Sequence, residues 1–500
     1  MKTANRHGGH GWPDIHRIPH PPHRIPFLGD LVGAHPATPV QDTMNIARNL
    51  GPIFRRKVFD HEFVFVSDSS MAAELVDESR FRKHVAESMT DLRDIAGDGL
   101  ATAYHHEPNW QRAHDILVPA FTREALKSYH PTMLAATRRL LDSWDRCVGG
   151  APVDVSRDMT KVTLETIARA GFGYDFGSFE RADPHPFVRA MVRALKFSQQ
   201  NAVEVPYIGS LLTRRAKRRN AQDTALMAEI VDEVVHRRMA DGDTGTHDML
   251  GLMLNTAHPE TGERLAPANI RNQVITFLVA GHETTAGALS FALYYLVKNP
   301  ALLAAAREEV ARVWGGGADP DPSYEQVTKL RHVRRCLEEA LRLWPTAPGF
   351  AREALEDTVI GGRHPMRRGA WAVVFTPMLH RDPVWGGDVE RFDPDRFTPE
   401  RVRARPAHVY KPFGTGARVC LGRQFALHEA TLVLAMLVHR YELEDHADYQ
   451  LKVHERLTLM PTGFTLALAH RAHHADGPGA ASAGAGRETS QNGAPEPADA

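Results

Sequence analysis

The segment Phe413-Gly-Thr-Gly-Ala-Arg-Val-Cys-Leu-Gly422 places a cysteine at the end of a glycine-rich loop. A helical pattern follows directly, from Arg423 to Leu434. The free backbone N–H groups and the dipole of that helix face the sulfur of Cys420, which favours a thiolate. Arg418, two residues before it, is suited to pairing with an anion. The segment therefore predicts either a functional thiolate or the small buried hydrophobic residue that cysteine more often is.

Two further observations narrow the role of Cys420. A phosphatase-type cysteine loop needs an Arg six residues after the cysteine, and this chain has Ala426 there. The three cysteines, Cys147, Cys336 and Cys420, are too widely spaced for a CxxC zinc or redox site. A metal-ligating cysteine beside a carboxylate-bearing cofactor remains, and haem has both an iron and two propionate carboxylates.

A long apolar stretch from Pro267 to Asn299 predicts a buried helix of roughly 30 residues, or ~45 Å, which is enough to cross a domain. Its middle reads Ala280-Gly-His-Glu-Thr284. Burying Glu283 and Thr284 costs free energy unless they are hydrogen-bonded or face a cavity. The alternative is a Thr hydroxyl bonded to the carbonyl one turn back, with Glu283 reaching solvent or an Arg. The HExxH zinc motif is excluded because position 286 is Ala.

Two other pairs of residues stand at helical spacing. Glu339 and Arg342 lie three residues apart, which puts the acid and the base on one helix face. On a surface such a pair contributes only about a few tenths of a kcal/mol, but Arg396 could complete a buried Glu–Arg network. Trp110 and His114 lie one turn apart and are suited to donating hydrogen bonds to a carboxylate. A core Trp capped by a surface His is the alternative interpretation of that pair.

The overall composition excludes several classes of protein. The chain carries 60 Lys and Arg against 61 Asp and Glu, a formal charge of −1, so it lacks the basic excess of a nucleic-acid binder. An odd number of cysteines excludes a disulfide framework and favours a reducing compartment. The first 26 residues contain no apolar signal segment, and no run approaches the ~18–20 apolar residues of a membrane span. We expect a cytoplasmic protein without a transmembrane segment and without a nucleic-acid partner.

Three parts are expected along the chain. Residues 1–26 resemble an extended lead-in rich in Pro and His, and residues 27–470 are expected to form one folded domain. Residues 471–500 contain no Val, Ile, Leu, Met, Phe, Tyr or Trp, which predicts a disordered tail. Amphipathic patterns predict helices at 160–170, 225–238, 300–314 and 325–343. Strand patterns occur at 62–66, 357–361 and 370–376, and a hairpin is predicted between 457–460 and 464–468.

Together and in this order, these features resemble the cytochrome P450 haem-thiolate monooxygenases. The family's FxxGxRxCxG motif matches residues 413–422, ExxR matches 339–342 and AGxET matches 280–284. The resemblance runs from about His23 to His470, and it is nearest to the haem domain of the self-sufficient bacterial fatty-acid hydroxylases. It implies a single-domain fold that is mainly α with a small β region. It also implies haem b between the long helix and the cysteine loop, with O2 as co-substrate.

The resemblance further implies roles for single residues. Cys420 would be the axial ligand of the haem iron. Glu283 and Thr284 would relay protons on the distal side of the haem. Three residues would stabilise the fold around the cysteine loop and take no part in the reaction: Glu339, Arg342 and Arg396. Other residues expected to contact the haem are Lys83, Trp110, His114, Phe413, Gly414, Arg418 and Gly422. The substrate pocket is expected to be lined by His61, Phe65, Met89, Leu92, Ala101, Ala280, Ala347 and Leu457.

The sequence departs from this subgroup in its partner and in its pocket. The subgroup continues into a flavin reductase, and no such domain follows in this sequence. Electrons from NAD(P)H are therefore expected through a separate reductase with a ferredoxin or flavodoxin, unless the sequence is part of a longer protein. Lys411 and Arg423 offer basic groups for docking it. His61 and Phe65 stand where an Arg and a Tyr are expected to hold a fatty-acid carboxylate. Ala101 replaces a bulky Phe over the haem, so a roomier pocket is expected.

These expectations lead to one main hypothesis and three alternatives. The main hypothesis is hydroxylation of medium- to long-chain fatty acids or similar apolar chains. Hydroxylation or epoxidation of a bulkier secondary metabolite, such as a terpenoid, polyketide or aromatic compound, is kept open by Ala101 and Phe65. A peroxide-using variant fits less well, because Glu283 and Thr284 belong to the oxygen-activating form. A haem-thiolate sensor or carrier, which is no enzyme, would not need a proton relay at all.

Overall fold

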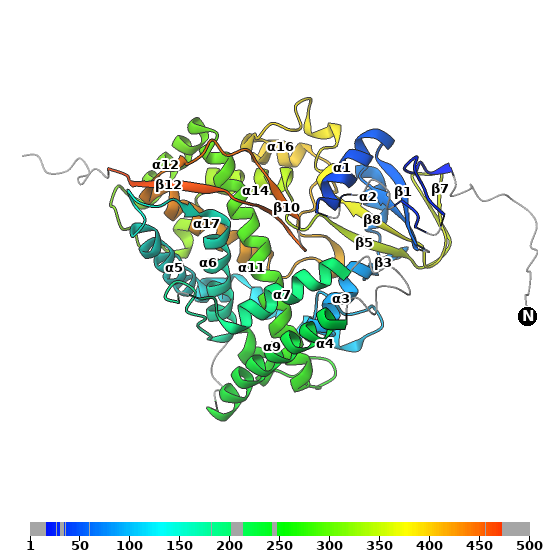
Figure 1. Cartoon of the computed structure of the whole chain (residues 1–500), viewed down its shortest axis with the longest axis horizontal. Coiled ribbons are helices and arrows are strands. Elements are labelled where there is room, and N and C mark those ends of the chain that lie inside the picture. Colours follow the sequence, from blue (N-terminus) through cyan, green and yellow to red (C-terminus); the bar gives the residue numbers. More distant parts are fainter. Residues whose placement is uncertain are drawn as a thin grey trace, which may run out of the picture.

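Helices dominate the computed structural model, and the strands gather mainly at one end of the molecule (Figure 1). The structure describes residues 17–472 except 27, 31–34, 36, 60, 182, 202–213, 243–247 and 456. The predicted lead-in lies outside the described residues at 1–16, and the predicted tail lies outside them at 473–500. The expectation of a mainly α fold with a small β region is confirmed. The expected boundaries of the lead-in, domain and tail stay a prediction.

Most helices are separated by short loops. The helices are α1 (Pro39–Leu50), α2 (Ser69–Leu75), α3 (Glu87–Ala96), α4 (Pro108–Leu117), α5 (Arg123–Asp145), α6 (Val155–Phe172), α7 (Pro186–Asn201), α9 (Arg214–Ala240), α10 (Met249–Asn255), α11 (Pro267–Val297), α12 (Pro300–Trp314), α13 (Tyr324–Thr328), α14 (Arg331–Leu343), α15 (Thr376–Leu379), α16 (Pro399–Ala404) and α17 (Arg423–Arg440). Four short 3-10 helices are η2 (Val118–Phe121), η3 (Pro383–Trp385), η4 (Pro394–Phe397) and η5 (Gly416–Arg418).

Within the described ranges, the strands form one larger sheet and three small ones. The strands are β1 (Ile53–Val58), β2 (His61–Val66), β3 (Phe81–His84), β4 (Val153–Asp154), β5 (Gly349–Ala354), β6 (Thr358–Ile360), β7 (His364–Met366), β8 (Trp371–Phe375), β9 (Tyr441–Asp445), β10 (Val453–Glu455), β11 (Leu459–Pro461) and β12 (Thr465–His470). The larger sheet has the order β1-β2-β8-β5-β3, with only the β2–β8 pair parallel. The small sheets are β4-β12-β9, β10-β11 and β6-β7.

Helix α11 is the central element of the helical body. It begins at Pro267, a residue suited to the first turn, as the sequence predicts. It packs against α6, α14, α17, α12 and α9, and also against β11. At Gly287 a side-chain carbon would lie 2.6 Å from the carbonyl oxygen of Leu459, so only glycine allows this close contact between α11 and β11.

Two sequence-based predictions of local structure are wrong. The predicted hairpin does not form: β11 pairs with β10, whereas β12 pairs with β9 and β4 in another sheet. Gly463, at φ +72°, lies in the connection between them, and β12 satisfies its backbone groups on strands far away in the sequence. The predicted helix at 325–343 is divided into α13 and α14, because Lys329 and Leu330 end one helix and cap the next.

No single helix among the described residues is both long and apolar enough to cross a membrane. Helices α11 and α12 pass that test only as a pair, and they are bent by 112° at their junction.

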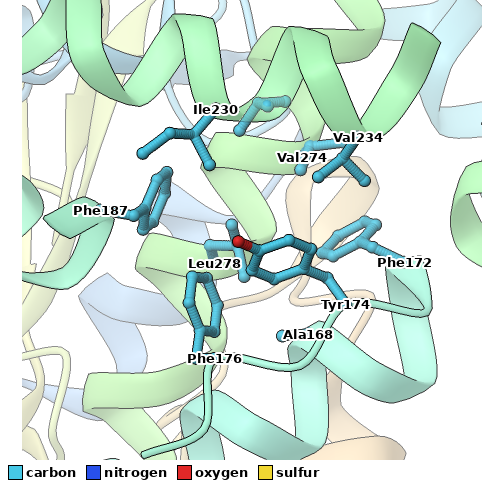
Figure 2. Close-up of a pocket in the computed structure, with 10 residues that line it drawn as sticks. Ala168, Phe172, Tyr174, Phe176, Phe187, Ile230, Val234, Val274 and Leu278 are labelled. Carbon is cyan, nitrogen blue, oxygen red and sulfur yellow. The ribbon is translucent and has the colours of Figure 1, made fainter. Parts of the chain in front are cut away.

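A small apolar void lies between α6, α7, α9 and α11 (Figure 2). Its volume is about 20 Å³, and aromatic side chains supply much of its lining. Phe187 and Phe176 pack against each other there with ring centroids 5.5 Å apart. Tyr174 reaches beyond the void, since its hydroxyl lies 3.1 Å from Nε2 of His185. This cluster joins α7 and α9 to the central helix α11.

Replacing Phe187 by Ala is expected to lower the free energy of unfolding by about 3–5 kcal/mol, because the side chain is fully buried beside an existing void. Chemical unfolding monitored by circular dichroism measures the change. Val192→Ala, on the same helix and 37% exposed, is the matched control and should stay within about 0.5 kcal/mol of the wild type. Equal unfolding midpoints for Phe187→Ala and the wild type would contradict this role of the cluster.

Candidate haem site and substrate cavity

A cavity of about 390 Å³ lies between α11 and the loop that precedes α17. Its lining is mainly apolar and comes from parts of the chain far apart in sequence. Predicted haem contacts that line it are Lys83, Trp110, His114, Phe413, Gly414, Arg418, Cys420 and Gly422. Predicted substrate and distal residues that line it are Met89, Ala101, Ala280, Thr284 and Ala347. The residues that line the cavity come from many parts of the chain, the first being Lys83 and the last Ala430.

Cys420 forms part of one wall of this cavity. The preceding turn η5 and a backbone hydrogen bond of 3.0 Å from Cys420 N to Phe413 O hold the loop in place. The thiol is open to the cavity but otherwise surrounded by protein, and this burial raises its pKa, although a backbone bond from Gly422 and the charge of Arg423 oppose the shift. The expectation that the helix dipole and the free backbone N–H groups favour a thiolate stays a prediction. Burial of the thiol in the polypeptide opposes deprotonation, and a bound metal would favour it.

Two of the three cationic side chains that line the cavity, Lys83 and Arg418, bond backbone carbonyls and no carboxylate. Lys83 donates a hydrogen bond of 2.6 Å to the carbonyl of Ala101, and burial together with the charge of Arg418 lowers its pKa to about 7. Arg418 donates to the carbonyls of Ala103 and Tyr104 and stacks over Trp110 at 3.8 Å. Burial lowers the pKa of Arg418 to about 10. Within the described part of the chain, neither cation has a carboxylate at ion-pair distance.

This donor set fits haem. Two buried cations that repel each other are costly by themselves, and an anionic group placed beside them removes the cost. A thiol whose pKa is raised by burial lies in the same space, and a bound metal would favour its thiolate. Haem supplies both the iron and the carboxylates, so Cys420 would bind the iron while Lys83, Arg418 and the Trp110 indole would hold the propionates. His114 stacks on Trp110 at 5.0 Å, but its Nδ1 already faces Asp115 at 2.9 Å.

The two residues predicted for proton relay occupy different sides of α11. Thr284 faces the cavity and donates a hydrogen bond of 2.8 Å to the carbonyl of Ala280. Glu283 does not line the cavity, is 5% exposed, and accepts a hydrogen bond of 3.2 Å from Thr458. Adjacent helix positions differ by about 100° in direction, which separates the two side chains. Only Thr284 therefore has direct access to the cavity in this conformation.

Glu339 and Arg342 form a bidentate ion pair in which both side chains are fully buried. Both distances are 2.7 Å. Arg342 also donates to three backbone carbonyls, those of His380, Val389 and Arg391. Arg396 completes the group at 3.5 Å from Glu339. Burial raises the pKa of the Glu339 carboxyl, and the bonds from Arg342 oppose that shift. The surface-pair alternative is therefore excluded.

His380 connects this ion pair to the cysteine loop, and sequence reasoning missed it. Its ring is fully buried; Nδ1 donates to the carbonyl of Arg342 at 3.2 Å, and Nε2 accepts from the N–H of Lys411 at 2.9 Å. One partner can only accept and the other can only donate, so a neutral ring with its proton on Nδ1 fits both. Burial and the charge of Arg342 lower its pKa to about 3. A His followed by Arg at the end of a short helix matches no motif, so the sequence alone gives no signal.

Four residues predicted for the pocket lie elsewhere. Leu92 is part of the apolar core, and Leu457 packs against that core. His61 is exposed at the start of β2, next to the β1–β2 turn. Phe65 stacks on Phe54 at 5.0 Å and meets Phe375 edge-on. These positions follow from the alternation of side chains along a strand and from core packing, which the resemblance to the family does not report. None of the four lines the cavity.

Comparison with known proteins identifies the family. A model of the family described as "Cytochrome P450" matches residues 19–468. The chain belongs to the cytochrome P450 family. This match confirms three predictions for this P450: its family, its mainly α fold and its assignment to the P450 monooxygenase class of enzymes.

The relatives extend the comparison. The chain is 46% identical to the "Bifunctional cytochrome P450/NADPH--P450 reductase" of Bacillus cereus over 459 residues, which cover 91% of this chain and 42% of the relative. It is 44% identical to the "Bifunctional cytochrome P450/NADPH--P450 reductase 1" of Bacillus subtilis over 453 residues, with 90% and 42% covered. It is 37% identical to the "Self-sufficient cytochrome P450 monooxygenase CYP505U2" of Exserohilum turcicum over 464 residues, with 92% and 43% covered. The chain thus spans about two-fifths of the length of these relatives.

The neutral His380 makes the stability of this P450 depend on pH. In the unfolded chain an ordinary His has a pKa of about 6.5, whereas the folded value is about 3. The unfolded state therefore takes up a proton first as the pH falls. The contribution of His380 to stability is fully present above about pH 6.5 and is lost towards pH 3, at up to ~1.4 kcal/mol per pH unit.

Chemical unfolding of the wild type and of His380→Gln at a series of pH values tests this. Gln offers one donor and one acceptor but does not titrate, so the variant should lose less free energy of unfolding per pH unit on acidification. Every other buried histidine is common to both proteins and cancels in the comparison. Parallel pH profiles for the two proteins would contradict the assignment.

Proposed function

We propose that this P450 is an O2-dependent monooxygenase that hydroxylates medium- to long-chain fatty acids or similar apolar chains. The observation that carries this proposal is a single cavity with Cys420 and two uncompensated cations on one side and apolar residues on the other. Met89, Ala101 and Ala280 present no charge to a bound chain. A cavity of this composition favours a lipid-like substrate.

Haem bound through a thiolate supplies O2 activation and the oxidation of an unactivated C–H bond to an alcohol. The chain's own residues bind, orient and move protons. Arg418 and Lys83 would neutralise the propionates, the Trp110 indole would donate a hydrogen bond to them, and the apolar wall would exclude water from the reacting carbon. Thr284 presents its hydroxyl to the cavity and is the residue that delivers a proton there. Glu283, bonded to Thr458 in this conformation, is the second residue proposed for the relay and would have to leave that bond to take part.

Electrons from NAD(P)H are proposed to arrive through a separate reductase with a ferredoxin or flavodoxin. Arg423 is exposed at the start of α17, three residues after Cys420, and Lys411 is half-buried in the preceding loop. These cations suit an acidic partner. The relatives named above include a reductase in the same protein, as their names state. A cytoplasmic location is proposed with this partner, supported by three cysteines that form no disulfide.

A bulkier secondary metabolite is the second candidate substrate, and two observations favour it. Ala101 lines the cavity with only a methyl group. His61 and Phe65, which stand in place of the expected carboxylate anchor, do not line it. A substrate without a carboxylate would lose nothing from their positions.

A spectral titration separates these two candidates. Purified ferric protein is titrated with fatty acids of graded chain length, and with uncharged alcohols of the same lengths, while the low- to high-spin change is recorded. A saturable shift that tightens with chain length supports the fatty-acid proposal. No shift with any acid would contradict it and would favour the uncharged or bulkier class.

Thr284→Ala is expected to uncouple electron use from product formation, because it removes the one hydroxyl assigned to deliver a proton. NAD(P)H consumed is compared with alcohol formed. Thr284→Ser, which keeps the hydroxyl, is the matched control and should retain most of the coupling. Unchanged coupling in Thr284→Ala would show that Thr284 does not carry the proton.

A further inference from the structure

The loop from Gly97 to Ala101 joins α3 to the wall of the cavity. Leu100 and Ala101 both line the cavity, so the course of this loop decides how much space a substrate has beside them. The loop lies directly against α11: at Gly97 and Gly99 an added side-chain carbon would collide with Asn272 and with Thr276, respectively. Gly97 also has φ +51°, which favours glycine. The two glycines let the loop approach α11 closely, and polar hydrogen bonds between the loop and α11 fix its position there.

Asp98 supplies the centre of those bonds. Its Oδ1 accepts hydrogen bonds of 2.8 Å from the side-chain amides of Asn269 and Asn272, both on α11. Its Oδ2 accepts one of 2.6 Å from the side-chain amide of Asn109 on α4. We call Asp98 with these three asparagines the Asp98 clasp. Burial raises the pKa of Asp98, but the three amide bonds outweigh it and the pKa is lowered, so the carboxylate is charged.

The clasp also fixes which way the neighbouring amides point. Because an ionised carboxylate only accepts, Asn269 must turn its NH2 to Asp98 and its oxygen away. That oxygen accepts from the side-chain amide of Gln273 at 3.2 Å. The Gln273 oxygen is then left to accept from the backbone N–H of Leu100 at 2.9 Å. A continuous chain of bonds therefore runs from Asp98 through α11 and back to the residue before Ala101.

The hydrogen bonds in this series are buried, so the direction in which each amide donates and accepts cannot change without losing a bond. Asn269 is 3% exposed and Gln273 is fully buried, so neither can replace a lost bond with bulk water. The other side of the clasp is ordered in the same way. The oxygen of Asn109 accepts from Arg112 at 2.8 Å, which leaves only its NH2 for Asp98. One negative charge thus orients the amides of α4 and α11 at once.

We propose that Asp98 is a positioning residue whose clasp holds Leu100 and Ala101 in place and thereby sets the site of oxidation along the substrate chain. The part of this inference that concerns the substrate rests on the proposed function. Asp98 itself acts at a distance from the cavity, through Asn269, Gln273 and the backbone N–H of Leu100.

Exchanging the charge within the clasp tests the inference. In Asp98→Asn, the new amide NH2 at position 98 faces the NH2 of Asn109, and two donors cannot bond to each other. If the Asn109 amide turned over to correct this, its NH2 would face the Arg112 guanidinium, which is also a donor. The double variant Asp98→Asn/Asn109→Asp restores the pattern: the amide oxygen introduced at position 98 still accepts from Asn269 and Asn272, and the amide NH2 donates to the new carboxylate beside Arg112. Asp94→Asn, which replaces an exposed acid on α3 four residues before Asp98, is the matched control for loss of charge.

The first readout is hydrogen–deuterium exchange of the peptide that contains the Leu100 and Thr102 amides, measured on haem-loaded protein without substrate. Asp98→Asn should exchange about fivefold to tenfold faster, as expected for the loss of one net hydrogen bond. Asp94→Asn should match the wild type, and the double variant should return to it. Unchanged exchange in Asp98→Asn, or no rescue in a folded double variant, would overturn the inference.

The second readout is the distribution of hydroxylated positions on one fatty acid. Asp98→Asn should broaden the distribution, and the double variant should restore it. Asn272→Ala removes a single donor and gives a milder version of both effects if Asp98→Asn does not fold. If the wild type oxidises no fatty acid, the proposed function fails, while the exchange measurement still decides whether the clasp holds the loop. Normal exchange effects with an unchanged product distribution would overturn the link to specificity.

Discussion

The ion pair between Glu339 and Arg342 lies where water reaches neither side chain. Burying two charges is costly, and the pair is tolerated because Arg342 also bonds three backbone carbonyls and Asp393 N donates to Glu339. Removing either partner would leave an uncompensated charge at a cost of about 3–5 kcal/mol. Those carbonyls belong to the segment between β8 and the cysteine loop, which has little regular structure of its own. Hydrogen bonds to the ion pair therefore stabilise that segment, as sheet or helix bonds would elsewhere. His380 bonds both Arg342 and the backbone N–H of Lys411, which links the ion pair to the start of the cysteine loop.

Residues between Lys411 and Ala430 form one wall of the cavity, and the groups on this wall are suited to an anionic ligand that carries a metal. Burial of Lys83 and Arg418 carries a cost in the polypeptide alone, since it lowers the pKa of both cations, and burial of Cys420 disfavours its thiolate by raising the pKa of the thiol. Two carboxylates would relieve the cost of the cations, and an iron would stabilise the thiolate. The other wall, to which Met89, Ala101 and Ala280 belong, is apolar, and the loop that carries Ala101 contributes to its shape. The same fold thus separates a polar haem-binding side from an apolar substrate side.

Much of this arrangement could be predicted from the sequence, and the rest shows where sequence reasoning ends. The long helix from Pro267, the strand and helix content and the cavity positions of Cys420, Arg418 and Thr284 follow from motif and periodicity. The direction of Glu283 could not be predicted, because its partner Thr458 lies 175 residues away. The hairpin failed for the same reason: β12 pairs with β9 and β4, and local patterns do not report partners distant in sequence. His380 and Asp98 belong to no motif, and only their hydrogen bonds to α14, α4 and α11 reveal a role.

The central claim is that Cys420, and no other cysteine of this chain, binds the iron of a haem held in this cavity. The ferrous carbon monoxide spectrum of haem-loaded protein tests it most directly, with Cys420→Ser compared with Cys336→Ser and Cys147→Ser. Cys336 is buried in α14 and Cys147 follows α5, both outside the cavity lining. The account predicts a thiolate-type spectrum in the wild type and in both control variants, and its loss in Cys420→Ser alone. A thiolate-type spectrum that survives in Cys420→Ser would contradict the account.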